Sequence, residues 1–216
     1  MYICPYFTPN QYRSPEEASY IRIFHASPNA PAVDIYINNR LTVRNLGYRQ
    51  FTQYLKITPG NYNIKVYPAG NTETPVLNLN AQIENNTILT AAAVGLLPNL
   101  NLQLIKDTPM TIPEGKVMIR LAHLSPDAPA VDGRINNSNV TFENLSFSNV
   151  SDYQSLNPGV YTLEVTPAGS DDVILIVPNI NLKANRFYTI YIIGLALGSP
   201  SLQVVIPLDG NSYIKF

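Results

Sequence analysis

The stretch IRIFHASPNAPAVD, residues 21–34, returns as IRLAHLSPDAPAVD at residues 119–132, with ten of the fourteen positions identical. His25 and His123 occupy the same place in the two stretches and lie 98 residues apart. That spacing is longer than the unit of a solenoid and close to the size of a small domain. The 216-residue chain is therefore predicted to contain one domain that occurs twice.

Both copies show sequence patterns that are typical of β-strands. Apolar and polar residues alternate over residues 61–67 and again over residues 160–166, each time just after a Pro-Gly step, which indicates strands with one buried face. Charged residues make up 13% of the chain, against about 25% in an average globular protein. Turn-forming Pro, Gly and Asn separate the apolar runs. Each copy is therefore predicted to be a β-sandwich of about seven short strands in an all-β chain.

The domain organisation follows from the repeat. We expect a first sandwich over residues 20–108, a proline-containing linker over residues 109–115, and a second sandwich over residues 116–216. Residues 1–19 show neither a strand nor a helix period, which predicts an irregular N-terminal arm. Cys4 is the only cysteine of the chain, so the monomer cannot contain a disulfide and must be stabilised by packing.

Both copies resemble the DUF4397 family, bacterial and archaeal domains that share a His-x-Ser-Pro-x-Ala-Pro-x-Val-Asp motif, here residues 25–34 and 123–132. The similarity continues through the Asn-Asn turns, the Pro-Gly-x-Tyr steps and the Pro-Ala-Gly strand ends, and covers nearly everything beyond residue 19. The resemblance implies two tandem sandwiches of immunoglobulin-like or transthyretin-like type with Greek-key connections. Members of the family are often exported or surface-associated, and they have no established activity.

The repeated motif also carries the residues from which a site could be built. A histidine that meets an aspartate can act as an oriented general base, and a nearby serine could serve as its nucleophile. The alternative is a structural role, in which each histidine pairs with its aspartate or clamps the backbone of the proline loop. A folding constraint acts on both copies alike, so the duplication favours the structural role. The candidate ligand-binding residues are His25, Ser27, Asp34, His123, Ser125 and Asp132.

The prolines and two tyrosines of the repeat are predicted to have structural roles. Two prolines three residues apart cannot lie in the middle of a sheet, because each lacks an N–H donor. A tyrosine after a Pro-Gly step resembles a tyrosine corner, whose hydroxyl binds the backbone just upstream. These residues are Pro28, Pro31, Pro126, Pro129, Tyr62 and Tyr161. In the second copy Gly133 replaces Ile35, which predicts a bulged or weakened strand.

Several classes of function are disfavoured by what the sequence lacks. The net charge is −1 and no two basic residues are adjacent, so the electrostatic footprint of a nucleic-acid-binding protein is missing. One histidine and one aspartate per copy fall short of a zinc site, and only Asp171-Asp172 approach a calcium site. We predict no metal, no cofactor and no catalytic residue. No apolar run reaches the roughly 18 residues of a membrane span, and the first twenty residues show no secretory signal.

We therefore expect a non-enzymatic interaction or structural module that binds a protein or glycan partner, or that forms a homodimer through its sheet edges. The alternative is a carbohydrate- or small-ligand-binding protein that uses its loops or the cleft between the domains. An unrecognised hydrolase comes third. A cell-envelope, surface or spore-coat location would suit the first interpretation, while the missing signal leaves a cytoplasmic location open.

Overall fold

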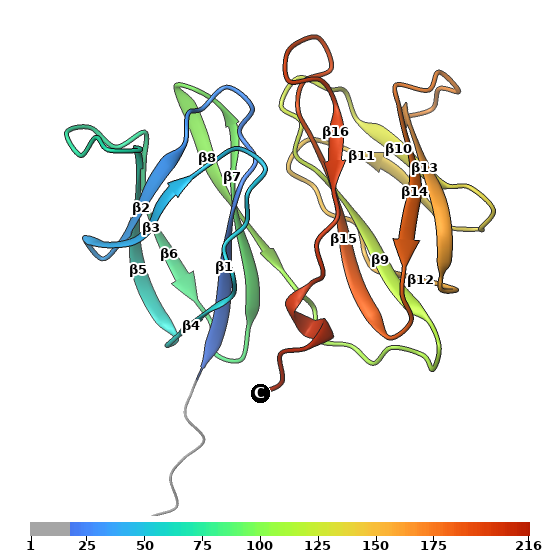
Figure 1. Ribbon diagram of the computed structural model, residues 1–216, viewed down its shortest axis with the longest axis horizontal. Helices are drawn as coiled ribbons and strands as arrows, with labels where there is room; N and C mark the ends of the chain where they lie inside the picture. The colour runs from blue at the N-terminus through green and yellow to red at the C-terminus, as the bar shows by residue number, and fades with distance from the viewer. Residues whose placement is uncertain (1–17) are drawn as a thin grey trace, which may run out of the picture.

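The computed structural model describes residues 18–216, and each copy of the repeat folds into a sandwich of two four-stranded sheets (Figure 1). In the first sandwich, one sheet has the order β4 (Leu55–Ile57), β1 (Ser19–His25), β7 (Ile88–Leu96), β8 (Asn99–Lys106). The other sheet has the order β3 (Arg40–Leu46), β2 (Val33–Ile37), β5 (Gly60–Pro68), β6 (Leu77–Ile83). The chain therefore changes sheet between β1 and β2, where the motif prolines lie.

The second sandwich repeats this arrangement strand for strand. One sheet has the order β12 (Gln154–Leu156), β9 (Val117–His123), β15 (Arg186–Ile193), β16 (Gln203–Val205). The other has the order β11 (Thr141–Leu145), β10 (Val131–Ile135), β13 (Gly159–Pro167), β14 (Leu175–Leu182). A short 3-10 helix, η1 (Gly210–Ser212), lies near the end of the chain.

The prediction of an all-β chain with two tandem sandwiches is confirmed, although each sandwich has eight named strands rather than about seven. The pairs β1–β7 and β9–β15 are parallel, and the other ladders are antiparallel. The strands divide between Lys106 and Val117, whereas the exact domain boundaries stay a prediction. Most of the predicted arm, residues 1–17, lies outside the described residues.

Local sequence explains the turns and corners. Asn38 and Asn39 take the positive φ angles of 49° and 63° that a tight hairpin needs, which asparagine tolerates better than most residues. The hydroxyls of Tyr62 and Tyr161 donate to the carbonyl oxygens of Thr58 (2.7 Å) and Asn157 (3.0 Å), four residues upstream. This is the bonding of a tyrosine corner in both sandwiches.

The bulge expected at Gly133 has a different cause from the one predicted. The register of β10 against β11 does shift between Val131 and Gly133, but β2 shifts against β3 at the matching place, between Val33 and Ile35. The bulge therefore belongs to both copies and does not depend on glycine. A Cβ atom at Gly133 would lie 2.7 Å from a methyl of Leu121, so the glycine makes room for core packing.

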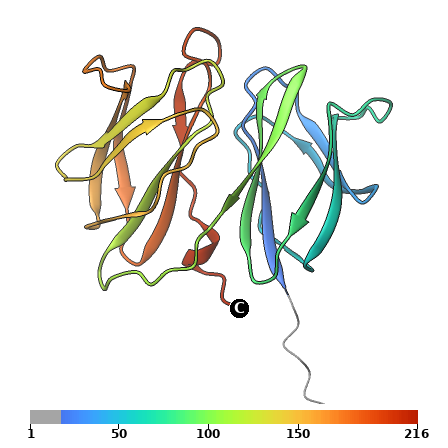
Figure 2. The ribbon, with the colours of Figure 1, turned by 180° about the vertical axis from the view of Figure 1, so that it is seen from behind.

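The two sandwiches lie face to face (Figures 1 and 2). Buried apolar side chains therefore form three layers, one inside each sandwich and one between them. The middle layer lies between the sheet of β1 and β7 and the sheet of β9 and β15, and it holds Phe24 and Tyr191. Both faces of these four strands are covered, so nearly every residue in them is buried. Strands covered on both faces read as continuous apolar runs rather than alternating ones.

Candidate functional site

The two histidines of the repeated motif are buried at the ends of β1 and β9. The Nε2 atom of His25 lies 2.9 Å from the carbonyl oxygen of Pro31, and that of His123 lies 2.9 Å from the carbonyl oxygen of Pro129. A carbonyl can only accept, so each Nε2 carries the proton and donates it. Each imidazole thus holds the proline loop that follows it against its own strand.

The motif serines bind the neighbouring central strands, at the same end of the sheet as the histidines. The hydroxyl of Ser27 donates to the carbonyl oxygen of Gly95 (2.8 Å), and that of Ser125 donates to the carbonyl oxygen of Gly194 (2.8 Å). Both serines are fully buried. These glycines have φ angles of 89°, so each serine ties the loop start to the point where the central strand turns away.

The motif aspartates point into the other sheet and do not meet the histidines. Asp34 accepts from the backbone N–H groups of Asn45 (2.7 Å) and Gly70 (3.0 Å). Asp132 accepts from those of Asn144 (2.7 Å) and Gly169 (3.0 Å) in the same way. These N–H groups lower the pKa of both carboxyls, because they stabilise the charged form.

The six candidate residues are therefore placed as clamps on backbone rather than around a shared cavity. Of the two structural arrangements considered above, the histidine clamp on the proline loop is the one present, and a His–Asp pair is not formed. Ser125 comes nearest to a catalytic contact, but it is its backbone N–H, not its hydroxyl, that donates to His123 Nδ1 (3.3 Å). No activated serine hydroxyl results from this geometry.

Replacing His25 or His123 with alanine is expected to lower the free energy of unfolding by about 1–3 kcal/mol, the usual cost of orphaning a buried hydrogen-bonding group. The carbonyl of Pro31 or Pro129 would lose its donor, and the loop would lose its attachment to the strand. Chemical denaturation followed by circular dichroism measures the change. Unchanged stability in both variants would contradict the clamp.

The pH dependence of stability provides a second readout for the same prediction. Burial lowers the pKa of both histidines, so the folded state favours neutral imidazole. Stability from these groups is complete above the unperturbed pKa of 6.5 and is lost as the pH falls below it. The double variant His25→Ala/His123→Ala should lose this part of the pH slope between neutral and mildly acidic solution.

A cluster of buried charges between the sandwiches was missed from the sequence. Its members come in equivalent pairs, one from each half of the chain: Arg22 and Arg120, Asp107 and Asp209, Tyr54 and Tyr153, Thr90 and Thr189. We call these eight residues the interdomain ion cluster. The available signal was an arginine at the second position of both copies of the motif, inside an otherwise apolar strand.

The interdomain ion cluster joins each half of the chain to the other. Arg22, on β1, donates to Asp209 (3.0 Å) near the end of the chain, and Arg120, on β9, donates to Asp107 (2.8 Å) just after β8. The four charged side chains are each at most 4% exposed. Each arginine is thus bound to the aspartate that follows the other sandwich, so the two ion pairs cross between the sandwiches in both directions.

The remaining donors of the cluster satisfy its carboxylates. The hydroxyl of Tyr54 donates to Asp107 (2.8 Å), and that of Tyr153 donates to Asp209 (2.7 Å). Burial raises the pKa of both tyrosines well above the ordinary value, so they remain donors. Burial and the nearby Asp209 carboxylate raise the pKa of Asp107 to about 6 against the pull of Arg120. The cluster therefore contains two cations and two anions, and these charged groups bond to one another and to the tyrosines inside the protein.

Within residues 18–216, no three His, Cys, Asp or Glu side chains gather as metal ligands. In the same span, no helix is long and apolar enough to cross a membrane.

Comparison with known families identifies the repeat. A model of a domain of unknown function, DUF4397, matches residues 19–134 and 134–214. The chain belongs to the DUF4397 family. The two matches meet inside β10, whereas strand pairing divides this DUF4397 pair between β8 and β9. Within residues 18–216, β10 pairs with β11 and β13, both strands of the second sandwich.

Solved structures similar to the DUF4397 pair are distant. A protein named "putative cell adhesion protein" from Bacteroides ovatus shares 9% identity, with 91% of this chain and 98% of that chain covered and a TM-score of 0.27. A protein of the same name from Bacteroides fragilis shares 9% identity over 88% and 97%, with a TM-score of 0.23. A leucine-rich repeat protein from Bacteroides thetaiotaomicron shares 13% identity and has a TM-score of 0.20, and 80% of this chain covers 25% of it. No curated protein matches the sequence.

Proposed function

We propose that this protein is a non-enzymatic interaction module in which two DUF4397 sandwiches act as one rigid body. The observation that carries the proposal is the shared layer between them, where an apolar core and a balanced ion cluster are buried together. A body of this kind presents its outer sheet faces in a constant relative orientation. An outer layer of the cell, such as the envelope or a spore coat, is the setting we propose for it.

The hydrogen bonds of the motif side chains favour this proposal over a catalytic role. The histidines, serines and aspartates of both copies are bonded to backbone groups of their own sandwich. A catalytic base needs access to a substrate proton, and these imidazoles are buried and directed at carbonyl oxygens. Residues that fix loops in this way keep the surface of each sandwich in one shape, as an interaction module requires.

Glycan binding is the second candidate, and one hollow of the surface favours it. A groove of about 600 Å³ lies between the β10–β11 turn and the β12–β13 turn of the second sandwich. Amide, hydroxyl and aromatic side chains line it together with Lys116, and the amides and hydroxyls can donate and accept the hydrogen bonds that a sugar needs. The side chains that line it include Asn137, Asn139, Gln154, Asn157 and Tyr161.

A glycan array probed with the purified protein separates the two candidates. Interaction through the outer faces alone predicts that no glycan binds at this groove, so Asn139→Ala would leave every signal on the array unchanged. Glycan binding predicts a signal that Asn139→Ala removes and that Asn181→Ala, an exposed asparagine on β14, retains. Turnover of generic ester or glycoside substrates that Ser125→Ala abolishes would contradict both candidates.

A further inference from the structure

Two sheets have one face that no hydrophobic layer within residues 18–216 covers. The sheet of β3, β2, β5 and β6 ends the molecule on one side, and the sheet of β11, β10, β13 and β14 ends it on the other (Figure 1). We call their solvent-facing surfaces the first end face and the second end face. They occupy equivalent positions in the two sandwiches, so the fold alone would make them alike.

The sequence gives these two faces opposite charge. Arg44 on β3 corresponds to Glu143 on β11, and Lys65 on β5 corresponds to Glu164 on β13. Arg44 and Glu143 are exposed, and Lys65 and Glu164 are half-buried. The strands form with either sign at these positions, so folding does not require the reversal.

Asparagines in the neighbouring turns hold the two central charges in place. The Nζ atom of Lys65 donates to the Oδ1 atom of Asn39 (2.8 Å), while the Nδ2 atom of Asn136 donates to Glu164 (2.7 Å). Arg134 also lies on the second end face, where its exposed guanidinium pairs with Asp171. The first end face thus presents positive charge and the second presents negative charge in fixed positions.

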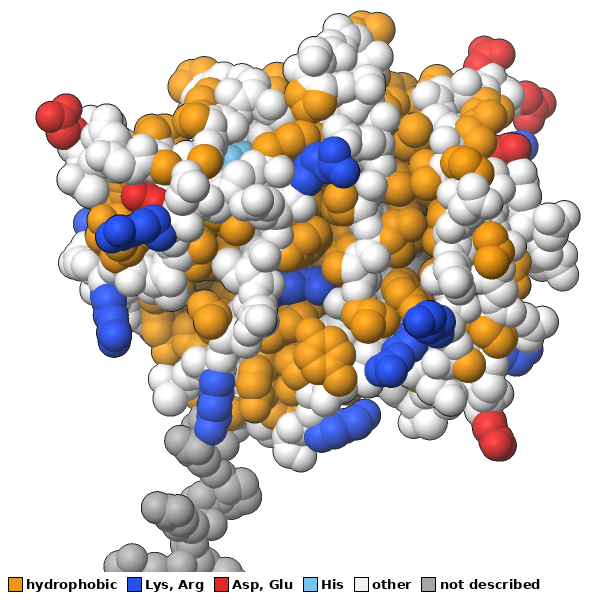
Figure 3. Space-filling model, viewed as in Figure 1, with side chains coloured by type: hydrophobic (Ala, Val, Ile, Leu, Met, Phe, Trp, Pro, Cys, Tyr) orange, Lys and Arg blue, Asp and Glu red, His pale blue; other side chains and the backbone are white. Residues whose placement is uncertain are grey.

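The net charge of each half agrees with the end faces. Residues 18–108 contain seven basic and four acidic residues, a surplus of +3, and residues 109–216 contain six basic and nine acidic residues, a surplus of −3. The interdomain ion cluster takes one arginine and one aspartate from each half and leaves both surpluses on the outside. Figure 3 shows acidic side chains gathered at the upper right, over the second sandwich, and basic side chains along the left edge, where some acidic ones also lie.

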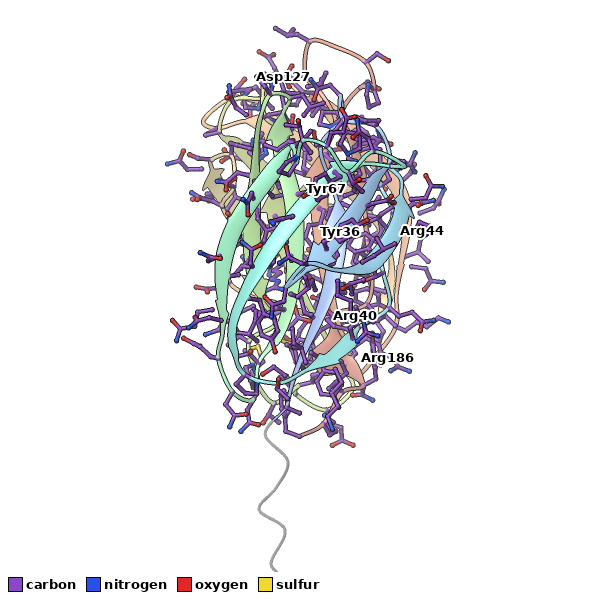
Figure 4. The ribbon with its side chains drawn as sticks, turned by 90° about the vertical axis from the view of Figure 1, so that its left-hand side faces the viewer. Tyr36, Arg40, Arg44, Tyr67, Asp127 and Arg186 are labelled. Carbon is purple, nitrogen blue, oxygen red and sulfur yellow. The ribbon has the colours of Figure 1, made fainter. Side chains whose placement is uncertain are left out.

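The apolar side chains of the end faces complement the charges. On the first end face, Tyr36 and Tyr67 pack edge to face with their ring centroids 5.3 Å apart, near Arg40 and Arg44 (Figure 4). In the second sandwich, Ile176 on β14 is 57% exposed. Aromatic residues surrounded by charges are typical of protein interfaces, where the charges supply specificity.

We propose that the protein associates head to tail with further copies of itself, the first end face of one copy against the second end face of the next. This proposal rests on the proposed interaction function, and it identifies the partner as a second copy of the same chain. Because the two faces differ and lie at opposite ends, two copies in contact still leave one face of each kind free. Such a heterologous contact extends into an open filament unless the rotation closes a ring.

Sedimentation velocity of the full chain tests the proposal. At low ionic strength we expect species larger than the 23.9 kDa monomer, growing with protein concentration. About 1 M salt shortens the Debye length to about 3 Å and should return the protein to monomer. A wild-type protein that stays monomeric at low salt and high concentration would overturn the proposal. The interaction function would survive that result if another partner binds.

Charge-reversal variants identify the faces. The variants Arg44→Glu/Lys65→Glu and Glu143→Lys/Glu164→Lys should each sediment as monomers, because both of their ends then carry the same sign. Their equimolar mixture should associate again, since one variant has two negative ends and the other two positive ends. The reversal Lys183→Glu, at an exposed position after β14, is the matched control and should not weaken association.

The outcomes of the variant experiment are decisive in either direction. Association of either face variant alone at the wild-type level, or a mixture that stays monomeric, would contradict the head-to-tail contact. Near-ultraviolet circular dichroism checks that both variants keep the native fold. Binding of an anionic polysaccharide to the first end face of a monomeric wild-type protein would assign that face to a different partner and overturn the proposal.

Discussion

Replacing Asp209 with alanine is expected to lower the free energy of unfolding by about 3–5 kcal/mol, the cost of removing one partner from a buried ion pair. Its carboxylate is fully buried and accepts from Arg22 (3.0 Å), Tyr153 (2.7 Å) and Thr189 (2.6 Å). Without it, the guanidinium of Arg22 would remain in the interface with no ion-pair partner among residues 18–216. Thermal and urea unfolding would both measure the loss.

An exposed ion pair of the same chain supplies the control. Asp171 pairs with Arg134 at 3.4 Å on the surface, where the aspartate side chain is 94% exposed. Asp171→Ala is expected to change stability by about 0–1 kcal/mol, as for most surface salt bridges. Asp107→Ala should resemble Asp209→Ala, because the cluster is built symmetrically. A loss at Asp209 no larger than that at Asp171 would show that the cluster does not stabilise the interface.

Replacing Tyr191 with alanine is expected to cost about 3–5 kcal/mol, the usual range for removing a large aromatic side chain from a core. Tyr191 is fully buried in the middle layer and packs against Phe24 and Phe51, with ring centroids 5.2 Å and 5.7 Å away. The truncation would open a cavity between two sheets that are fixed on their other faces. Urea denaturation of the variant measures the effect.

Tyr213 provides the comparison for Tyr191. It lies after η1, and 54% of its surface is exposed, so Tyr213→Ala should cost clearly less than Tyr191→Ala. The middle layer belongs to both sandwiches, so we also expect Tyr191→Ala to shift the unfolding of the whole molecule. Two separate transitions in the variant, with the first sandwich unaffected, would contradict a shared core.

The repeat made most of the fold predictable. Each signal that placed a strand or a turn was local, as with the alternation around Ile64 or the paired asparagines at 38 and 39, and local signals depend on backbone preferences that act in isolation. The histidine clamp was among the alternatives for the same reason, because His25 and Pro31 are only six residues apart. The partner of Asp34 was not foreseen, because Gly70 is 36 residues away on another strand.

The packing of the two sandwiches against each other could not be predicted from either copy alone. At equivalent positions the first copy supplies Phe24 and Ala92 to the middle layer, and the second supplies Ala122 and Tyr191. A large residue in one copy therefore corresponds to a small one in the other. The two sheets face each other, so a large side chain from one copy fills the space that a small side chain of the other copy leaves. Neither copy shows this complementarity by itself.

The motif of residues 21–34 and its copy determined that the chain is one β-sandwich used twice, because strand periodicity and proline-terminated strands are properties of short segments. The tertiary structure decided what the motif does. It directed the histidines and serines onto backbone carbonyls, and it placed Arg22 and Arg120 opposite aspartates from the far ends of the two halves. Buried charges need partners from wherever the fold can bring them, and that choice depends on long-range packing rather than on local sequence.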